Sequence, residues 1–161
     1  MRNENVLRPI LAFFTIILLI QCVSGVLLFA VKLGFTPESI TGFYLGNEEQ
    51  FIRPKTFAGL LEITVPHLAA IGAVLFILGH LVSLLSRGKS RFVNSTLYVC
   101  FLSAAANLSA GYLIRFVHPG FLYLKLLCFT LFALAFAALI LVVIQSVIVG
   151  PETRNCRGER T

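Results

Sequence analysis

Residues 121–149 read FLYLKLLCFTLFALAFAALILVVIQSVIV, and this stretch contains a single charged residue, Lys125. A bilayer core is crossed by about 20 apolar residues in an α-helix. The stretch lacks the alternation of polar and apolar positions that a transmembrane β-strand shows. Because lipid offers no partner for unpaired backbone groups, the stretch predicts a membrane-spanning helix.

Three further apolar stretches are long enough to cross a bilayer, at about 10–31, 60–85 and 92–114. Hydrophobic residues make up 58% of the 161-residue chain and charged residues 12%, with a mean hydropathy of +0.92. A soluble domain has about 25% charged residues, so the composition excludes a soluble globular protein and a disordered one. We expect an all-α integral membrane protein, a four-transmembrane-helix bundle that forms one domain over 1–161 and ends in a cytoplasmic tail at 150–161.

The basic residues lie between the apolar stretches, where they act as topology signals. The chain has 13 Lys and Arg against 7 acidic residues, all of which are Glu. Eight of the basic residues would lie on one side of the membrane: Arg2, Arg8, Arg87, Lys89, Arg91, Arg154, Arg157 and Arg160. The positive-inside rule then places both termini of this multi-pass protein in the cytoplasm of a bacterial inner membrane. This charge distribution predicts contact with the lipid bilayer and no nucleic-acid partner.

The longest loop, about 32–59, contains the start and stop signals of a short helix. Thr36 suits the N-cap, Pro37 the first helical position, and Glu38 adds an acid to the first turn. Gly46 and Asn47 form the stop signal. We expect a short amphipathic helix in this first extracytoplasmic loop, either a lid over the bundle or an anchor at the membrane surface, and we favour the anchor.

Strongly polar side chains inside a membrane are costly, and they are therefore the first candidates for function. The candidates are Gln21, Glu62, His67, His80, Asn107, Arg115, His118 and Lys125. Lys125 lies near the start of the last helix, and we expect its side chain to snorkel outward.

The histidines suggest a haem b. His67 lies in the outer half of the second span, and His118 lies in the outer turn before Pro119. A haem iron between these two imidazoles, with Arg115 near the propionates, would use common axial ligands, and a quinone at the same place is the other option. A two-haem arrangement through His67 and His80 is disfavoured. Their side chains would lie about 20 Å apart along the axis and about 140° apart around it.

His80 also belongs to a stripe of one helical face. The stripe consists of Glu62, Ala69, Ala73, Phe76, His80 and Ser83. We expect this stripe to be a packing face that turns His80 into the bundle, where it would bond Asn107 or Gln21. Ser103, Asn107 and Gly111 form a second row of small residues with one amide, expected at the bundle centre. The span at 121–149 is expected to be the most lipid-exposed helix.

Three segments resemble a family of small four-helix inner-membrane proteins of proteobacteria, whose activity is largely uncharacterised. The segments are FAGLLEITVPHL at 57–68, GHL at 79–81 and RFVHPGF at 115–121. The family pattern has a pair of membrane histidines two residues apart, and this chain has Val65 in place of the first of them. The resemblance implies a fold rather than an activity. The chain is also loosely similar to cytochrome b561-like bundles in its helix count and buried histidines.

These observations lead to one functional hypothesis and two rivals. The chain is expected to be a membrane subunit of an electron-transfer system that binds a b-type haem or quinone near the outer face. Its partner would be another redox or membrane subunit, or a second copy in a homodimer. The alternative is a non-catalytic accessory or assembly subunit of a membrane complex whose histidines are structural. A proton-coupled carrier that uses Glu62 and His80 is third.

Overall fold

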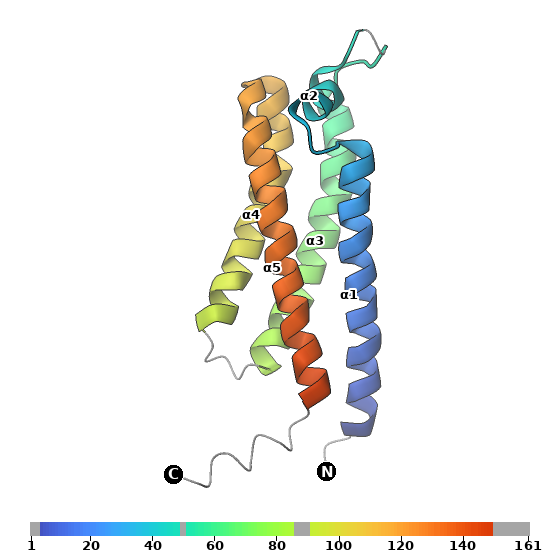
Figure 1. The fold of residues 1–161 in the computed structure, drawn as a ribbon, viewed down its shortest axis with the longest axis vertical. Coiled ribbons are helices and arrows are strands. Elements are labelled where there is room, and N and C mark those ends of the chain that lie inside the picture. The colour runs from blue at the N-terminus through green and yellow to red at the C-terminus, as the bar shows by residue number, and fades with distance from the viewer. Residues whose placement is uncertain (1–3, 49–50, 86–90, 150–161) are drawn as a thin grey trace.

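The computed structural model describes residues 4–48, 51–85 and 91–149, and within these ranges the chain is helical apart from short connections and one isolated bridge between Asn47 and Ile52. The elements are α1 (Glu4–Lys32), α2 (Pro37–Leu45), α3 (Phe57–Leu85), α4 (Arg91–Phe116), the 3-10 turn η1 (Pro119–Phe121) and α5 (Leu122–Val149). Four of them, α1, α3, α4 and α5, are long and apolar enough to cross a membrane. The predicted fold class is therefore confirmed (Figure 1).

Helix α5 contacts all three other long helices and makes its most extensive contact with α4. Its residues Leu139, Ile140 and Val143 are almost fully buried in the main core cluster, together with Leu78 of α3 and Cys100 of α4. The expectation that 121–149 is the most lipid-exposed span is therefore wrong. A uniformly apolar sequence suits a protein interior and a lipid surface equally well, so hydropathy alone cannot distinguish the two.

Helix α1 takes the more lipid-exposed position at the edge of the bundle (Figure 1). Large side chains such as Phe13, Ile17 and Ile20 are more than 60% exposed, and the buried residues of α1 are few. Leu18 of α1 joins the main core cluster, and Phe14 and Cys22 pack against it. The helix therefore lies against the bundle along a narrow seam.

Helix α2 closes one end of the bundle, at the end opposite the start of α1 and the end of α5 (Figure 1). The Thr36 side chain accepts a hydrogen bond from the Ser39 amide at 3.2 Å, and Gly46 ends the helix with φ +87°. A Cβ at Gly46 would lie 2.6 Å from the Ile52 carbonyl oxygen, so this stop requires glycine. Both predicted signals are present.

The buried face of α2 packs on the long helices. Ile40 and Tyr44 belong to a second, smaller core cluster with Leu60 of α3, Ile114 of α4 and Leu122 of α5. The helix is therefore a lid on the bundle, and the anchor that we favoured from the sequence is the wrong alternative. Amphipathicity alone could not decide this, because a protein surface and a membrane surface both accept an apolar helix face.

Candidate functional site

The predicted packing stripe of α3 faces away from the bundle. Glu62, Ala69, Ala73, Phe76 and His80 are all exposed, and we call these five residues the outer stripe. The buried face of α3 lies about 160–180° around the helix from it and carries Leu60, Leu75, Leu78 and Val82. The expectation that the stripe packs inside this chain is wrong, and Ser83 at its end is only half-buried. The large aliphatic side chains of the opposite face fill the core instead.

His80 does not turn into the bundle. Its Nδ1 donates to the Phe76 carbonyl oxygen at 2.9 Å, one turn earlier in α3, and its ring centroid lies 4.3 Å from that of Phe76. Neither Asn107 nor Gln21 is its partner, and Gln21 is itself exposed on α1. Because Nδ1 is used within α3, Nε2 is the ring nitrogen that remains for a partner outside this helix.

His67 has the same arrangement in the half of α3 that lies nearer the lid. Its Nδ1 donates to the Ile63 carbonyl oxygen at 2.7 Å, and its side chain is exposed. A carbonyl can only accept, so the proton lies on Nδ1 and the neutral ring keeps a lone pair on Nε2. This is the tautomer that metal-bound histidines usually show.

His118 has the opposite arrangement. Its Nδ1 accepts a hydrogen bond from the Gly120 amide at 2.9 Å, as the N-cap of η1, and the side chain is exposed. The neutral ring therefore carries its proton on Nε2. Binding a metal through Nε2 would move this proton to Nδ1 and break the hydrogen bond from the Gly120 amide. No hydrogen bond or ring contact joins His118 to His67 within the described chain. The free Nε2 of His67 therefore suits an axial ligand of haem iron, and the protonated Nε2 of His118 suits it poorly.

Arg115 is held at the lid end of α4. Its Nε donates to the Lys55 carbonyl oxygen at 2.8 Å, and its guanidinium lies 5.6 Å from the Phe116 ring centroid. The Lys55 Nζ lies 4.7 Å from the Phe43 ring centroid. Neither cation forms an ion pair with a carboxylate in the parts of the chain that the structure describes. Both are therefore free to attract an anion at this end of the bundle.

Lys125 is buried, with 8% of its surface exposed, and does not snorkel outward. Its Nζ donates to the Asn107 backbone carbonyl oxygen at 2.9 Å and lies 6.0 Å from the Tyr44 ring centroid. The Asn107 side-chain oxygen is buried and has no hydrogen-bond partner among the described residues. This polar contact between α5 and α4 is therefore made by the lysine and the backbone of Asn107, and not by the amide that the sequence suggested.

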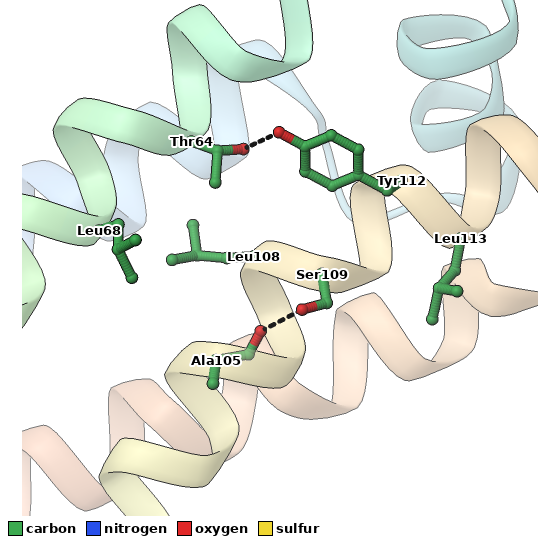
Figure 2. A pocket seen from close by; sticks show the side chains of 7 residues that line it. All are labelled: Thr64, Leu68, Ala105, Leu108, Ser109, Tyr112 and Leu113. Atoms are coloured by element: carbon green, nitrogen blue, oxygen red, sulfur yellow. Dashed lines mark hydrogen bonds between the residues drawn. The ribbon is translucent and has the colours of Figure 1, made fainter. Parts of the chain in front are cut away.

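A groove with a cavity of about 380 Å³ lies between α3 and α4, and Figure 2 shows its lining residues. They are Thr64, Leu68, Ala105, Leu108, Ser109, Tyr112 and Leu113. The Tyr112 hydroxyl donates to the Thr64 hydroxyl at 3.1 Å, and the Ser109 hydroxyl donates to the Ala105 carbonyl at 2.9 Å. Since these polar groups bond one another or the backbone, the groove is effectively apolar. The sequence did not indicate this groove, because its shape depends on how α3 and α4 pack side by side.

The fold and these sites define a small multi-pass integral membrane protein whose long helices carry polar residues on exposed faces. Residues 34–154 match a family of transmembrane helical domains, and because the match covers most of the chain, the protein belongs to this family, Aq_1264_TM. The match includes α2, α3, α4 and α5 and begins after α1. No curated protein and no solved structure matches the chain.

Proposed function

We propose that this protein is an accessory subunit of a membrane complex and that the outer stripe of α3 packs against a membrane-spanning helix of another subunit. The observation that carries the proposal is the exposure of Glu62 and His80 on the outer face of a spanning helix. Ionisable residues within spans almost always face other protein or a water-filled cavity, because lipid solvates them poorly. A neighbouring subunit would supply that environment.

The composition of the outer stripe supports a helix as the partner. Ala69 and Ala73 lie four residues apart between the two polar ends, and small residues at this spacing let a second helix approach closely. A Cβ added at Gly72, which borders the stripe, would meet nothing within 4 Å. The Nε2 of His80 adds a polar group that a partner helix can bond, an interaction of about 1 kcal/mol in a membrane.

The test is the size of the complex in the native membrane. We expect the chain, extracted in a mild detergent, to migrate on a native gel as a species larger than the single chain. Ala73→Leu should release the free chain, because the added side chain keeps the partner helix away. Ala30→Leu, at an exposed position of α1, is the matched control and should leave the complex intact. Migration of the unsubstituted protein as a single chain would contradict the proposal. A complex that contains only copies of this chain would show that the partner is a second copy, in a homodimer.

The proposed setting is a bacterial inner membrane with both termini in the cytoplasm. The start of α1 and the end of α5 lie at the same end of the bundle (Figure 1), and the sequence that borders this end is rich in Arg and Lys. Positive loops are retained on the cytoplasmic side. A reporter active only outside the cytoplasm, fused after residue 149, should therefore be silent, and the same reporter in the loop after α2 should be active.

A second candidate function is electron transfer through a b-type haem, and the tautomers of His67 and His80 favour it. Both rings hold the Nδ1 proton on a backbone carbonyl and leave Nε2 free. Arg115, whose Nε is fixed, would hold a propionate through its remaining nitrogens. A bound haem, or a quinone in its place, would supply one-electron redox chemistry. Reduced-minus-oxidised spectra of protein made with ample haem test this candidate: a b-type band lost in His67→Ala supports it, and colourless folded protein contradicts it.

The proton-coupled carrier receives the least support. Its two residues, Glu62 and His80, lie on the outer stripe and not on a path between the helices of this chain. A carrier role for them would require that the pathway run along the interface with a partner.

A further inference from the structure

We propose that the groove between α3 and α4, together with Arg115 above it, is a binding site for an anionic phospholipid. One acyl chain would lie in the groove, and the phosphate would bind the Arg115 guanidinium. The groove lies on the opposite side of α3 from the outer stripe, so this site is independent of the proposed subunit interface.

The groove is suited to an acyl chain because its lining is apolar and accessible. It lies between the two core clusters, above the level of Leu75 and below that of Leu60 on α3. Leu68 is 61% exposed at its edge, and the polar groups of Thr64, Ser109 and Tyr112 are already bonded. A hydrocarbon chain would cover exposed leucine without burying an unpaired donor or acceptor.

The positive charge of Arg115 lies on the face of α4 that lines the groove. Leu108, Tyr112 and Arg115 follow one another at spacings of four and three residues, so they share one helical face. Arg115 lies about 10 Å above Leu108 along the helix axis, at the lid end where α3 begins. The hydrogen bond from Nε to the Lys55 carbonyl holds the guanidinium in place and leaves both terminal nitrogens for a ligand.

Charge complementarity identifies the ligand. Arg115 and Lys55 are both cationic, and neither has a carboxylate partner among the residues that the structure describes. A guanidinium binds phosphate with two parallel hydrogen bonds, and basic pockets between spanning helices bind anionic headgroups. A zwitterionic lipid would bring its own cation to the site, and a quinone carries no charge. An anionic phospholipid has both features that the site requires: an acyl chain that fits the groove and a net negative charge that binds Arg115.

The test is native mass spectrometry of the purified full chain, offered phosphatidylglycerol and phosphatidylcholine of equal chain length. We expect the unsubstituted protein to retain phosphatidylglycerol in preference, and Arg115→Gln to reduce that retention about fivefold, the effect of one basic residue. The control is Arg53→Gln, which removes an exposed arginine from the connection between α2 and α3 that also contains Lys55, and should change nothing. Ser109→Phe, which fills the groove, should lower the retention of both lipids.

Two results would overturn the proposal. One is equal retention of both lipids by the unsubstituted protein, which does not depend on whether any variant folds. The other is an equal loss in Arg115→Gln and Arg53→Gln, which would indicate diffuse surface charge instead of a site.

Discussion

Tyr44 of α2 lies directly against Gly111 of α4, so that a Cβ at position 111 would come within 3.0 Å of the tyrosine ring. Position 111 is buried, and Tyr44 is 5% exposed. This contact holds the lid on the bundle above Lys125, and it depends on the absence of a side chain at one position in a spanning helix.

The first prediction concerns this contact. Gly111→Val should destabilise the protein by about 1–3 kcal/mol, because the tyrosine ring and α2 must move to admit the new side chain. Gly25→Val is the matched control, since a Cβ at Gly25 of α1 would meet nothing within 4 Å. Thermal unfolding in detergent measures both variants. Equal melting temperatures of Gly111→Val and Gly25→Val would show that Tyr44 does not pack on position 111.

The second prediction concerns the pH dependence of stability. Burial raises the pKa of the Tyr44 hydroxyl from 10.0 to about 12. The unfolded chain loses this proton near pH 10 while the folded chain keeps it, so the free energy of unfolding is unaffected below pH 10 and falls as the pH rises from 10 toward 12. A loss of about 2 kcal/mol by pH 11.5 is expected.

The variants that test this assignment are Tyr44→Phe and Tyr98→Phe. Tyr44→Phe removes the ionisable group and should flatten the alkaline limb of the stability curve. Tyr98 is 71% exposed, so Tyr98→Phe should leave that limb as it is in the unsubstituted protein. An unchanged limb in Tyr44→Phe would mean that another group causes the alkaline loss.

The third prediction concerns the central position of α5. Leu139→Ala removes a fully buried side chain from the main cluster and should cost about 2 kcal/mol or more. Leu134→Ala, on the same helix, removes a leucine that is 65% exposed and should cost much less. The free energies of unfolding of the two variants are measured in a denaturing detergent and compared with that of the unsubstituted protein. If Leu134→Ala were the more damaging change, α5 would pack on the bundle through a different face from the one that carries Leu139.

The fourth prediction concerns Lys125. A buried ammonium with one carbonyl partner is costly, so Lys125→Met should leave stability within about 1 kcal/mol of the unsubstituted protein or raise it. Lys125→Glu should be strongly destabilising, because a carboxylate would face the Asn107 carbonyl oxygen. A large loss in Lys125→Met would contradict this prediction and would mean that the fold needs the charge at position 125.

The sequence predicted well the features that depend on local chemistry. Apolar length identified the spanning helices, and Thr36, Pro37 and Gly46 identified α2, because capping groups act within one turn. The sequence predicted poorly which face of each helix is buried. The stripe from Glu62 to His80 and the position of α5 were both misassigned, since lipid and protein interiors are similarly apolar and their difference leaves little pattern in the residues.

The candidate site depended on longer-range geometry and was harder to predict. The buried Lys125 lies beside Tyr44 of α2, with its Nζ 6.0 Å from the ring centroid, although the two residues are far apart in the chain. The tautomers of His67 and His118 depend on which backbone group each ring meets, and the residue type alone does not reveal this. The groove likewise depends on the packing of α3 against α4, two helices that contribute its lining residues.

Photo-cross-linking from the outer stripe in native membranes tests whether this face of α3 packs against another subunit. A benzophenone amino acid placed at position 73 should form an adduct with another membrane protein, and the same probe at position 30 of α1 should react only with lipid. We predict protein adducts that are specific to position 73. Lipid adducts alone at position 73 would contradict it, because the outer stripe would then face the bilayer and need no partner.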